Sequence, residues 1–331
     1  MTRRRQILGV LCGAAGSMLW PYAADAQQPV STMPVIGFLH AGEPEESASR
    51  LQAFRNGLRD TGYEEGRNLT IEYRWAKGDY SRLAVMAAEL VGRPVRVLAA
   101  TTTPSAVAAK AATTNIPVVF TTGGDPVQLG LVASFNRPGG NVTGATMLSR
   151  VLVGKQFEIL HGLVPSAAVV GFLVNPKDAN AQSAIKDAIQ GAETLRQKPI
   201  IVTASTAEEI EAAFNTLSEQ HVEALVVDGD AFILSRHERV VSLAQQHSIP
   251  AIYAFREYVA AGGLVSYSPS LVDAYHQAGM YAGLILNGEM PTNLPVVQPT
   301  KFDFAINLRT AKALGLSVPM TLQVAADEVI Q

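Results

Sequence analysis

Three consecutive threonines, Thr101, Thr102 and Thr103, stand between an apolar run and an alanine-rich stretch that is predicted to be a helix. The first turn of a helix leaves backbone N–H groups without partners, and its dipole favours an anion. Threonine hydroxyls beside these groups could hold the carboxylate or phosphate of a bound molecule. Capping of the helix by Thr103 would satisfy the same donors without a ligand. Because three threonines exceed what one cap needs, we expect them to contact a ligand.

Carboxylates at other predicted strand ends could bind a cation. Asp125 follows two glycines, and Asp228 and Asp230 flank Gly229 after a later apolar run. In a cleft these side chains would accept hydrogen bonds from an amine, so together with the threonines they would suit a zwitterionic amino acid. The alternatives are a helix start at Asp125 and an Asp-Gly turn at Gly229, which local backbone geometry alone favours.

Aromatic side chains at the last predicted strand ends, Phe255 and Tyr267, could stack on a flat or apolar ligand. A partly buried core position is the alternative for Tyr267, and a hinge position is the alternative for Met147. The full set of residues expected to contact a ligand is Ala41, Gly42, Thr101, Thr102, Thr103, Gly123, Asp125, Met147, Asn175, Asp228, Asp230, Phe255, Glu257 and Tyr267.

Signatures of catalysis and of metal binding are missing from the sequence. It contains no Gly-x-Gly-x-x-Gly after its first strand, no Gly-x-Ser-x-Gly, no Walker loop and no His-Glu-x-x-His. The 6 histidines show no metal-ligand spacing, and Cys12 is the single cysteine. We therefore expect no catalytic residue, no metal site, no cofactor and no disulfide.

The elements that must position these residues alternate between strands and helices, which is typical of parallel sheets covered by helices on both faces. In the first half the expected strands are 34–39, 69–75, 95–99 and 116–120, and the expected helices are 48–61, 82–91 and 105–113. Near the C-terminus the pattern predicts strands at 264–267 and 302–308 and helices at 271–287 and 310–314.

This series of elements occurs twice. The run 35–39 recurs at 169–173 with an offset of 134, the run 95–98 recurs at 222–225 with an offset of 127, and Ile116-Pro117 recurs as Ile249-Pro250 with an offset of 133. Three matches in one order at nearly constant offset predict two similar doubly wound parallel-sheet lobes of the α/β class. The strand ends of the two lobes would then line a shared ligand cleft.

The extra helix and strand near the C-terminus predict a chain that crosses between the lobes more than once. We expect lobe 1 to comprise 33–147 plus 269–295, and lobe 2 to comprise 148–268 plus 296–331, joined near Met147 to Val151 by a multi-crossover hinge.

The N-terminus has the pattern of a cleaved export signal at residues 1–26. Arg3, Arg4 and Arg5 precede a short apolar stretch that ends at Ala24-Asp-Ala26. Arg4-Arg-Gln-Ile-Leu8 also fits a twin-arginine signal, and an ordinary secretory signal rich in arginine is the alternative. Either route predicts a periplasmic protein.

Charge and hydropathy exclude some partners. Removal of 1–26 takes away three arginines and one aspartate, which leaves 23 basic and 28 acidic residues and a net charge of −5. That balance argues against a nucleic-acid partner. No second apolar segment approaches the length of a bilayer span, so we expect no stable membrane insertion.

Several motifs resemble those of a large family of bacterial ABC-transporter substrate-binding proteins. They are Gly57-Leu-Arg-Asp-Thr-Gly-Tyr63, Glu65-Gly-Arg-Asn-Leu-Thr-Ile-Glu72, Asp125-Pro-Val127, Gly130-Leu-Val-Ala-Ser134, Arg137-Pro-Gly-Gly-Asn-Val-Thr-Gly144, Ala261-Gly-Gly-Leu264, Gln298-Pro-Thr-Lys-Phe302 and Ala311-Lys-Ala-Leu-Gly-Leu316. The resemblance runs from about Met33 to Gln331. It implies a periplasmic-binding fold of type I with three crossovers, hinge closure, a membrane permease as partner, and relatives that bind aromatic amino acids. Thr101 to Thr103 depart from the Gly-containing loop of many relatives.

These features predict the solute-binding component of an ABC importer, which closes on a small polar or aromatic solute such as an amino acid. A periplasmic sensor subunit that signals to a membrane kinase is one alternative, and an exported enzyme on the same fold is another.

Overall fold

The computed structural model describes residues 33–148, 152–298 and 300–331. The expected signal peptide at 1–26, its twin-arginine motif and residues 149–151 of the expected link between the lobes lie outside the described residues.

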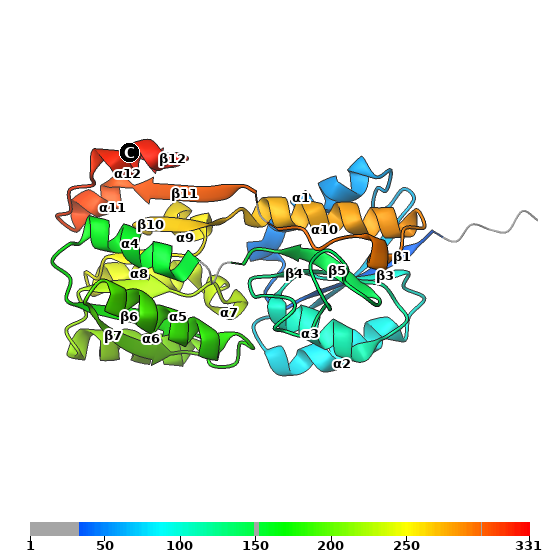
Figure 1. Ribbon diagram of the computed structural model, residues 1–331, viewed down its shortest axis with the longest axis horizontal. Coiled ribbons are helices and arrows are strands. Elements are labelled where there is room, and N and C mark those ends of the chain that lie inside the picture. The colour runs from blue at the N-terminus through cyan, green and yellow to red at the C-terminus, as the bar shows by residue number, and fades with distance from the viewer. Residues whose placement is uncertain (1–32, 149–151, 299) are drawn as a thin grey trace, which may run out of the picture. The chain divides into compact units, whose positions relative to one another are not determined.

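The N-terminal sheet has five parallel strands in the order β2-β1-β3-β4-β5. Its strands are β1 (Val35–His40), β2 (Thr70–Trp75), β3 (Val97–Ala100), β4 (Val118–Thr122) and β5 (Val142–Thr146). Helices α2 (Leu83–Val91) and α3 (Thr103–Ala112) pack together over one face, and α1 (Ala48–Asp60) and α10 (Leu271–Leu286) over the other. Figure 1 shows these helices around the sheet. Because both faces are covered, the interior strands β1 and β3 are almost wholly apolar.

The second sheet has seven strands in the order β12-β11-β10-β9-β8-β6-β7. Its strands are β6 (Val169–Val174), β7 (Lys198–Thr203), β8 (Ala224–Val227), β9 (Ala251–Tyr253), β10 (Val265–Pro269), β11 (Phe302–Asn307) and β12 (Glu328–Ile330). The helices of this lobe are α4 (Val153–Leu163), α5 (Ala181–Thr194), α6 (Ala207–Glu219), α7 (Ala231–Leu234), α8 (His237–Gln246), α9 (Arg256–Ala260), α11 (Leu308–Ala313) and α12 (Met320–Ala325). Short 3-10 helices are η1 (Glu45–Ser47), η2 (Tyr80–Arg82) and η4 (Pro291–Asn293).

The internal repeat is visible in the strand order. Strands β7-β6-β8-β9-β10 of the second sheet follow the same order as β2-β1-β3-β4-β5 of the first, so the expectation of two doubly wound lobes is confirmed. Gly37 of β1 and Gly171 of β6 occupy equivalent places. A Cβ on Gly37 would lie 2.8 Å from Leu98, and a Cβ on Gly171 would lie 2.6 Å from Leu217. Both lobes therefore use a glycine where side chains press closely on the strand next to the sheet edge.

Strand β11 departs from the expected all-parallel arrangement, because it pairs antiparallel with β10 in the register Val265 to Ile306. The chain leaves the second sheet at the carboxyl end of β10 and forms α10, which packs on the first sheet against β4 and β5. On returning it re-enters at the same end, where the backbone N–H of Ser270 donates to the Lys301 carbonyl. A strand that enters from that end must run opposite to β10.

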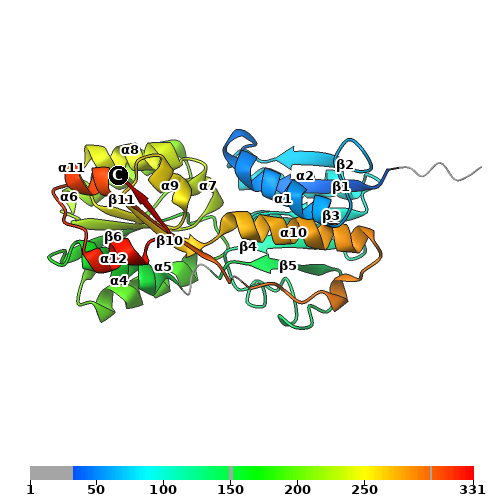
Figure 2. The ribbon, with the colours of Figure 1, turned by 90° about the horizontal axis from the view of Figure 1, so that it is seen from above.

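Helices α1 and α10 lie side by side, as Figure 2 shows, although more than 200 residues separate them in the sequence. Glycines allow their backbones to approach. A Cβ on Gly57 would lie 2.0 Å from the His276 carbonyl oxygen, and a Cβ on Gly279 would lie 2.0 Å from the Phe54 carbonyl oxygen. No helix in the described part of the chain has both the length and the apolar character needed to cross a bilayer.

Candidate ligand-binding site

A pocket lies at the carboxyl ends of strands from both sheets, and it encloses about 540 Å³ of space when its open mouth is counted. Its walls come from the segments after β1, β3, β4, β5, β6, β8 and β9 and from the first turns of α1, α7 and α10. The lining residues are His40, Gly42, Glu46, Ser47, Arg50, Thr101, Thr102, Thr103, Pro104, Thr121, Thr122, Gly123, Met147, Asp178, Gly229, Ala231, Leu234, Ser235, Phe255, Leu271 and Tyr275. Strand ends of a doubly wound sheet are where such folds bind ligands.

The threonine loop after β3 forms one wall of this pocket. Thr102 caps α3, because its Oγ1 accepts from the Ser105 backbone N–H at 3.4 Å. Thr103, the alternative cap, instead bonds through Oγ1 to the Thr122 hydroxyl at 2.9 Å and accepts from the Gly123 N–H at 3.3 Å. The Thr101 hydroxyl is buried and has no hydrogen-bond partner in the protein. A buried hydroxyl without a partner costs free energy, so it is available to a ligand.

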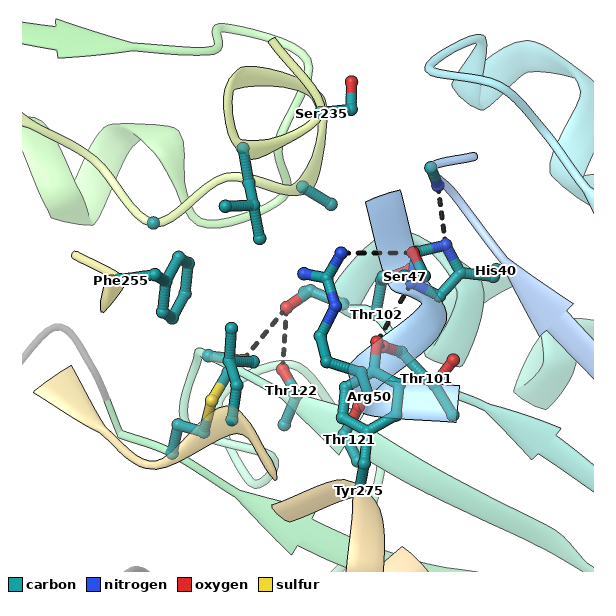
Figure 3. Close-up of a pocket in the computed structure, with 18 of the residues that line it drawn as sticks. His40, Ser47, Arg50, Thr101, Thr102, Thr121, Thr122, Ser235, Phe255 and Tyr275 are labelled. Atoms are coloured by element: carbon teal, nitrogen blue, oxygen red, sulfur yellow. Dashed lines mark hydrogen bonds between the residues drawn. The ribbon is translucent and has the colours of Figure 1, made fainter. Parts of the chain in front are cut away.

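Arg50 on α1 is the most unusual residue of the pocket, and Figure 3 shows its side chain near Ser47, Thr101 and Thr122. It is only 4% exposed. Its Nη2 donates to the Glu46 carbonyl at 2.7 Å and to the Ser47 hydroxyl at 3.1 Å, whereas its Nε has no partner. Among the described residues no carboxylate forms an ion pair with it. A buried cation without a counter-ion calls for an anionic ligand.

Arg50 is not among the residues predicted from the sequence to contact a ligand, although a signal for it was present. Arg50 precedes Phe54 by four positions and Leu58 by eight, so it lies on the apolar face of α1 rather than on its solvent face. A charged residue on the buried face of the helix that follows the first strand is the pattern that could have revealed it.

His40 and Tyr275 hold the floor of the pocket in place. The Gly42 N–H donates to His40 Nδ1 at 2.8 Å, so the ring proton lies on Nε2, which donates to the Tyr275 hydroxyl at 2.9 Å. Tyr275 in turn donates to the Thr101 carbonyl at 2.7 Å. Burial, and then the Arg50 charge, hold the pKa of His40 well below its usual range. The hydrogen bonds from His40 through Tyr275 to Thr101 orient Thr101, and because His40 is neutral they add no charge beside Arg50.

The opposite part of the pocket is apolar. Met147, Leu234, Phe255 and Leu271 are buried hydrophobic side chains that line it, and they come from both lobes. They belong to a core cluster that is continuous between the two lobes. The pocket thus combines a cationic, hydroxyl-bearing side with an apolar and aromatic side, which suits a solute that carries an anionic group on an apolar body.

Glu46 lies beside this cationic side, one helical turn before Arg50. Its Oε2 is buried and has no partner. Burial and the neighbouring Glu43 raise the pKa of Glu46 to about 7, against the opposing charges of Arg236 and Arg50. Glu43 itself pairs with Arg236 of the second lobe at 3.2 Å.

Asp230 and Asn175, both predicted ligand contacts, bond to the protein instead. Asp230 caps α7, and its Oδ1 accepts from the N–H groups of Phe232 and Ile233 and from Asn175 Nδ2 at 2.9 to 3.0 Å. Its Oδ2 accepts from the Tyr80 hydroxyl at 2.7 Å. Burial and the nearby Asp178 carboxylate raise the pKa of Asp230, while these hydrogen bonds oppose the shift.

Of the predicted contacts, the structure brings seven together as pocket lining: Gly42, Thr101, Thr102, Thr103, Gly123, Met147 and Phe255. The other seven, Ala41, Asp125, Asn175, Asp228, Asp230, Glu257 and Tyr267, lie outside that lining.

Asp125 and Tyr267, two of the residues outside the lining, make contacts elsewhere in the protein. Asp125 closes a turn, since its Oδ1 accepts from Val127 N–H at 2.8 Å and from Gln128 N–H at 3.3 Å. Tyr267 stacks on Phe302 with ring centroids 6.0 Å apart, which matches the core alternative considered for it. The described residues contain no group of three His, Cys, Asp or Glu side chains placed to hold a metal ion.

Two doubly wound lobes with a pocket at their strand ends are the construction of periplasmic solute-binding proteins. The chain belongs to the family of ABC transporter substrate binding proteins, whose sequence model matches residues 44–330.

Individual relatives agree with this assignment. A tyrosine-binding protein of Clostridioides difficile is 29% identical over 265 residues, which cover 80% of this chain and 76% of that protein. A conserved domain protein from Vibrio cholerae has a structure with a TM-score of 0.84 and 29% identity, covering 90% of this chain and 100% of its own. The ABC domain of Streptococcus pneumonia in complex with L-Trp has a TM-score of 0.82 and 25% identity, with the same coverage of both chains.

Proposed function

We propose that the protein is the periplasmic solute receptor of an ABC importer and that its solute is a small aromatic amino acid. The single observation that carries this proposal is the pocket in which Arg50 Nε and the Thr101 hydroxyl are buried without protein partners. Polar groups in that condition are stabilised when a ligand supplies the missing partner.

The chemistry of the two pocket sides supports this class of solute. Arg50 and Thr101 would bind a carboxylate, and Phe255 with Leu271 would contact an aromatic side chain. One relative is named for tyrosine binding, and another was solved with L-Trp.

Seven of the residues predicted from the sequence remain proposed contacts: Gly42, Thr101, Thr102, Thr103, Gly123, Met147 and Phe255. We add Arg50 to them. We assign Asp230 and Asn175 to the support of α7 rather than to the solute, because their polar atoms already have partners.

Closure of the two lobes over the solute would create the form that a membrane permease recognises. In this proposal residues 33–147 with 269–295 move as one body and 148–268 with 296–331 as the other, with one correction to the expected boundary. Val296 and Val297 move with the first body, because their backbones bond to Phe135 and to β5. The protein would reach the periplasm through its expected signal at 1–26, and it would release its solute unchanged rather than turn it over.

A binding screen tests the proposal. The chain from Gln27 onward is expected to show a higher melting temperature with L-tyrosine, L-tryptophan or L-phenylalanine, since a ligand at 100 times its Kd adds about 2.7 kcal/mol. Isothermal titration would give the affinity, and small-angle scattering would report a smaller radius of gyration with the ligand. A folded protein that binds none of these amino acids would contradict the assigned solute class.

A further inference from the structure

Glu46 and Arg50 lie on successive turns of one continuous helical segment, and both line the pocket. The turn between them is closed by Arg50 Nη2, which donates to the Glu46 carbonyl at 2.7 Å. The Ser47 hydroxyl accepts from the same nitrogen at 3.1 Å. These bonds hold the guanidinium of Arg50 in one orientation, while its Nε is left without a partner.

The two opposite charges do not neutralise each other. Among the described residues no ion pair joins the Glu46 carboxylate to Arg50, and Glu46 Oε2 is buried with no partner. Glu46 and Arg50 each have an unpartnered buried atom and lie one helical turn apart. They could therefore pair with a molecule that carries an ammonium and a carboxylate group on one carbon.

We infer that Arg50 and Glu46 form a clamp for a free α-amino acid, in which Arg50 Nε and the Thr101 hydroxyl bind the α-carboxylate and Glu46 binds the α-ammonium group. This inference rests on the proposed solute-receptor function and specifies how the solute is recognised. The side chain of the amino acid would then lie against Phe255 and Leu271, which line the apolar side of the same pocket.

Such a clamp discriminates by leaving a charge unpaired when the wrong molecule binds. A carboxylic acid without an amine would pair with Arg50 but would leave Glu46 without a counter-ion. An amine without a carboxylate would leave Arg50 unpaired in the same way. Buried groups left without partners are the reason that polar sites reject such analogues strongly.

The surroundings of Glu46 make this recognition sensitive to pH. The charged groups near Glu46 are Glu43, Arg50, Arg236 and Glu238. Its pKa is raised to about 7, so below that pH the unliganded pocket holds a protonated Glu46 that cannot pair with ammonium. Binding of an amino acid would then require release of a proton, and the affinity should fall as the pH decreases from 7 to 5.

The test uses matched sets of ligands with the full chain after removal of the expected signal. One set is L-tryptophan, indole-3-propionate and tryptamine, and the second is L-tyrosine, 3-(4-hydroxyphenyl)propionate and tyramine. We expect the amino acid of at least one set to bind at least 30-fold more tightly than its two analogues in isothermal titration.

Variants of Glu46 and Arg50 then test which residue binds the ammonium group and which binds the carboxylate. Glu46→Gln should weaken binding of the amino acid at least tenfold and should reduce its advantage over the deaminated acid to less than threefold. Arg50→Gln should also weaken binding of the amino acid at least tenfold, and it should reduce the advantage of the amino acid over tryptamine or tyramine to less than threefold. Glu45→Gln and Arg59→Gln remove exposed charges from the same segment and should leave all affinities unchanged. Circular dichroism verifies that each variant is folded. If Arg50→Gln does not fold, the Glu46→Gln variant by itself is sufficient to test the clamp.

Two outcomes would overturn the clamp. One is equal affinity for the amino acid and its deaminated acid, and the other is a Glu46→Gln variant that keeps the full discrimination. Either result would leave the receptor function intact if these solutes still bind. Failure of both ligand sets and of a wider panel of solutes would reject the proposed function together with the clamp.

Discussion

The hydroxyl of Tyr80 donates to Asp230 Oδ2 at 2.7 Å, although the two residues belong to different lobes and lie 150 positions apart. The same hydroxyl accepts from the Phe232 N–H at 2.9 Å. A side chain of the first lobe thus completes the N-terminal cap of α7 in the second lobe. In the proposed closure this bond would exist only while the lobes are together, so it would stabilise the closed form directly.

Replacement of Tyr80 by phenylalanine should therefore favour the open form. Loss of the Tyr80 hydroxyl would leave the buried Asp230 Oδ2 without its donor, which costs about 1–3 kcal/mol, so we expect the Kd for the solute to rise by about tenfold. Isothermal titration measures the change, and stopped-flow kinetics should place most of it in a faster dissociation rate. An unchanged Kd would show that the Tyr80 bond is not used in closure.

Glu43→Gln is the matched comparison, because it removes another contact between the lobes. The Glu43–Arg236 pair is partly exposed on both sides, with side-chain exposures of 29% and 32%. Exposed ion pairs contribute only about 0–1 kcal/mol. We expect the Kd to change less than about fivefold at 0.15 M salt, and less still at 0.5 M salt. A loss as large as that of Tyr80→Phe would contradict this ranking of the two contacts.

Thr101→Val should have opposite effects on stability and on binding. It replaces a buried hydroxyl that has no protein partner with a methyl group of the same shape. We expect the unliganded protein to gain up to about 1 kcal/mol in urea unfolding, and the Kd for an amino acid to rise about tenfold or more.

Thr143→Val is the control for that substitution. The Thr143 hydroxyl is buried but donates to the Leu294 carbonyl at 2.6 Å, away from the pocket. Its loss should cost about 1–2 kcal/mol of stability and leave the Kd unchanged. If Thr101→Val destabilised the protein as much as Thr143→Val does, the Thr101 hydroxyl would have a partner in solution.

The stability of the unliganded protein should depend on pH through Glu46. The pKa of Glu46 is raised to about 7 when folded, above the ordinary value of 4.5. Folding therefore favours the protonated form, and its stabilising effect is present below pH 4.5 and is lost as the pH rises to about 7. Relative to Glu46→Gln, the wild-type protein should lose about 1 kcal/mol over this window, a modest figure because Glu46 is partly exposed. Urea unfolding of both proteins at pH 5, 6, 7 and 8 measures the difference, and a constant difference would contradict the raised pKa.

Gly57→Ala should destabilise the first lobe, because a Cβ there would lie 2.0 Å from the His276 carbonyl of α10. Forced separation of two packed helices should cost about 1–3 kcal/mol. Gly154→Ala is the control, since nothing lies within 4 Å of a Cβ at that position of α4. That variant should be neutral or more stable by up to about 1 kcal/mol, as expected for alanine in a helix. Thermal unfolding of both variants distinguishes packing from helix propensity.

The two doubly wound lobes could be predicted from the sequence because the information is local. Residues 35–39 and 169–173 are apolar runs that lie in the interior strands β1 and β6, and their recurrence at an offset of 134 indicated the repeat. The direction of β11 could not be predicted in this way. It depends on where α10 packs, and the chain returns from that helix at the carboxyl end of β10.

The candidate site was predicted in part for the same reason. Thr101, Thr103 and Phe255 follow buried strands, and strand ends of a doubly wound sheet must meet at one edge. The sequence did not reveal which polar groups at these strand ends keep a hydrogen-bonding atom without a protein partner. Asp230 loses its free atoms to Tyr80 and to the first turn of α7, and Thr101 keeps its hydroxyl free.

The sequence by itself determined the alternating elements, the repeat and the strand ends at which the candidate ligand-binding residues gather, because periodicity and glycine placement act within a few residues. Only the tertiary structure decided that Arg50 is buried without a counter-ion and that Asp230 is bonded within the protein. These properties depend on burial and on partners more than 100 positions away, and the free energy of a charged group is set by the neighbours that folding brings to it.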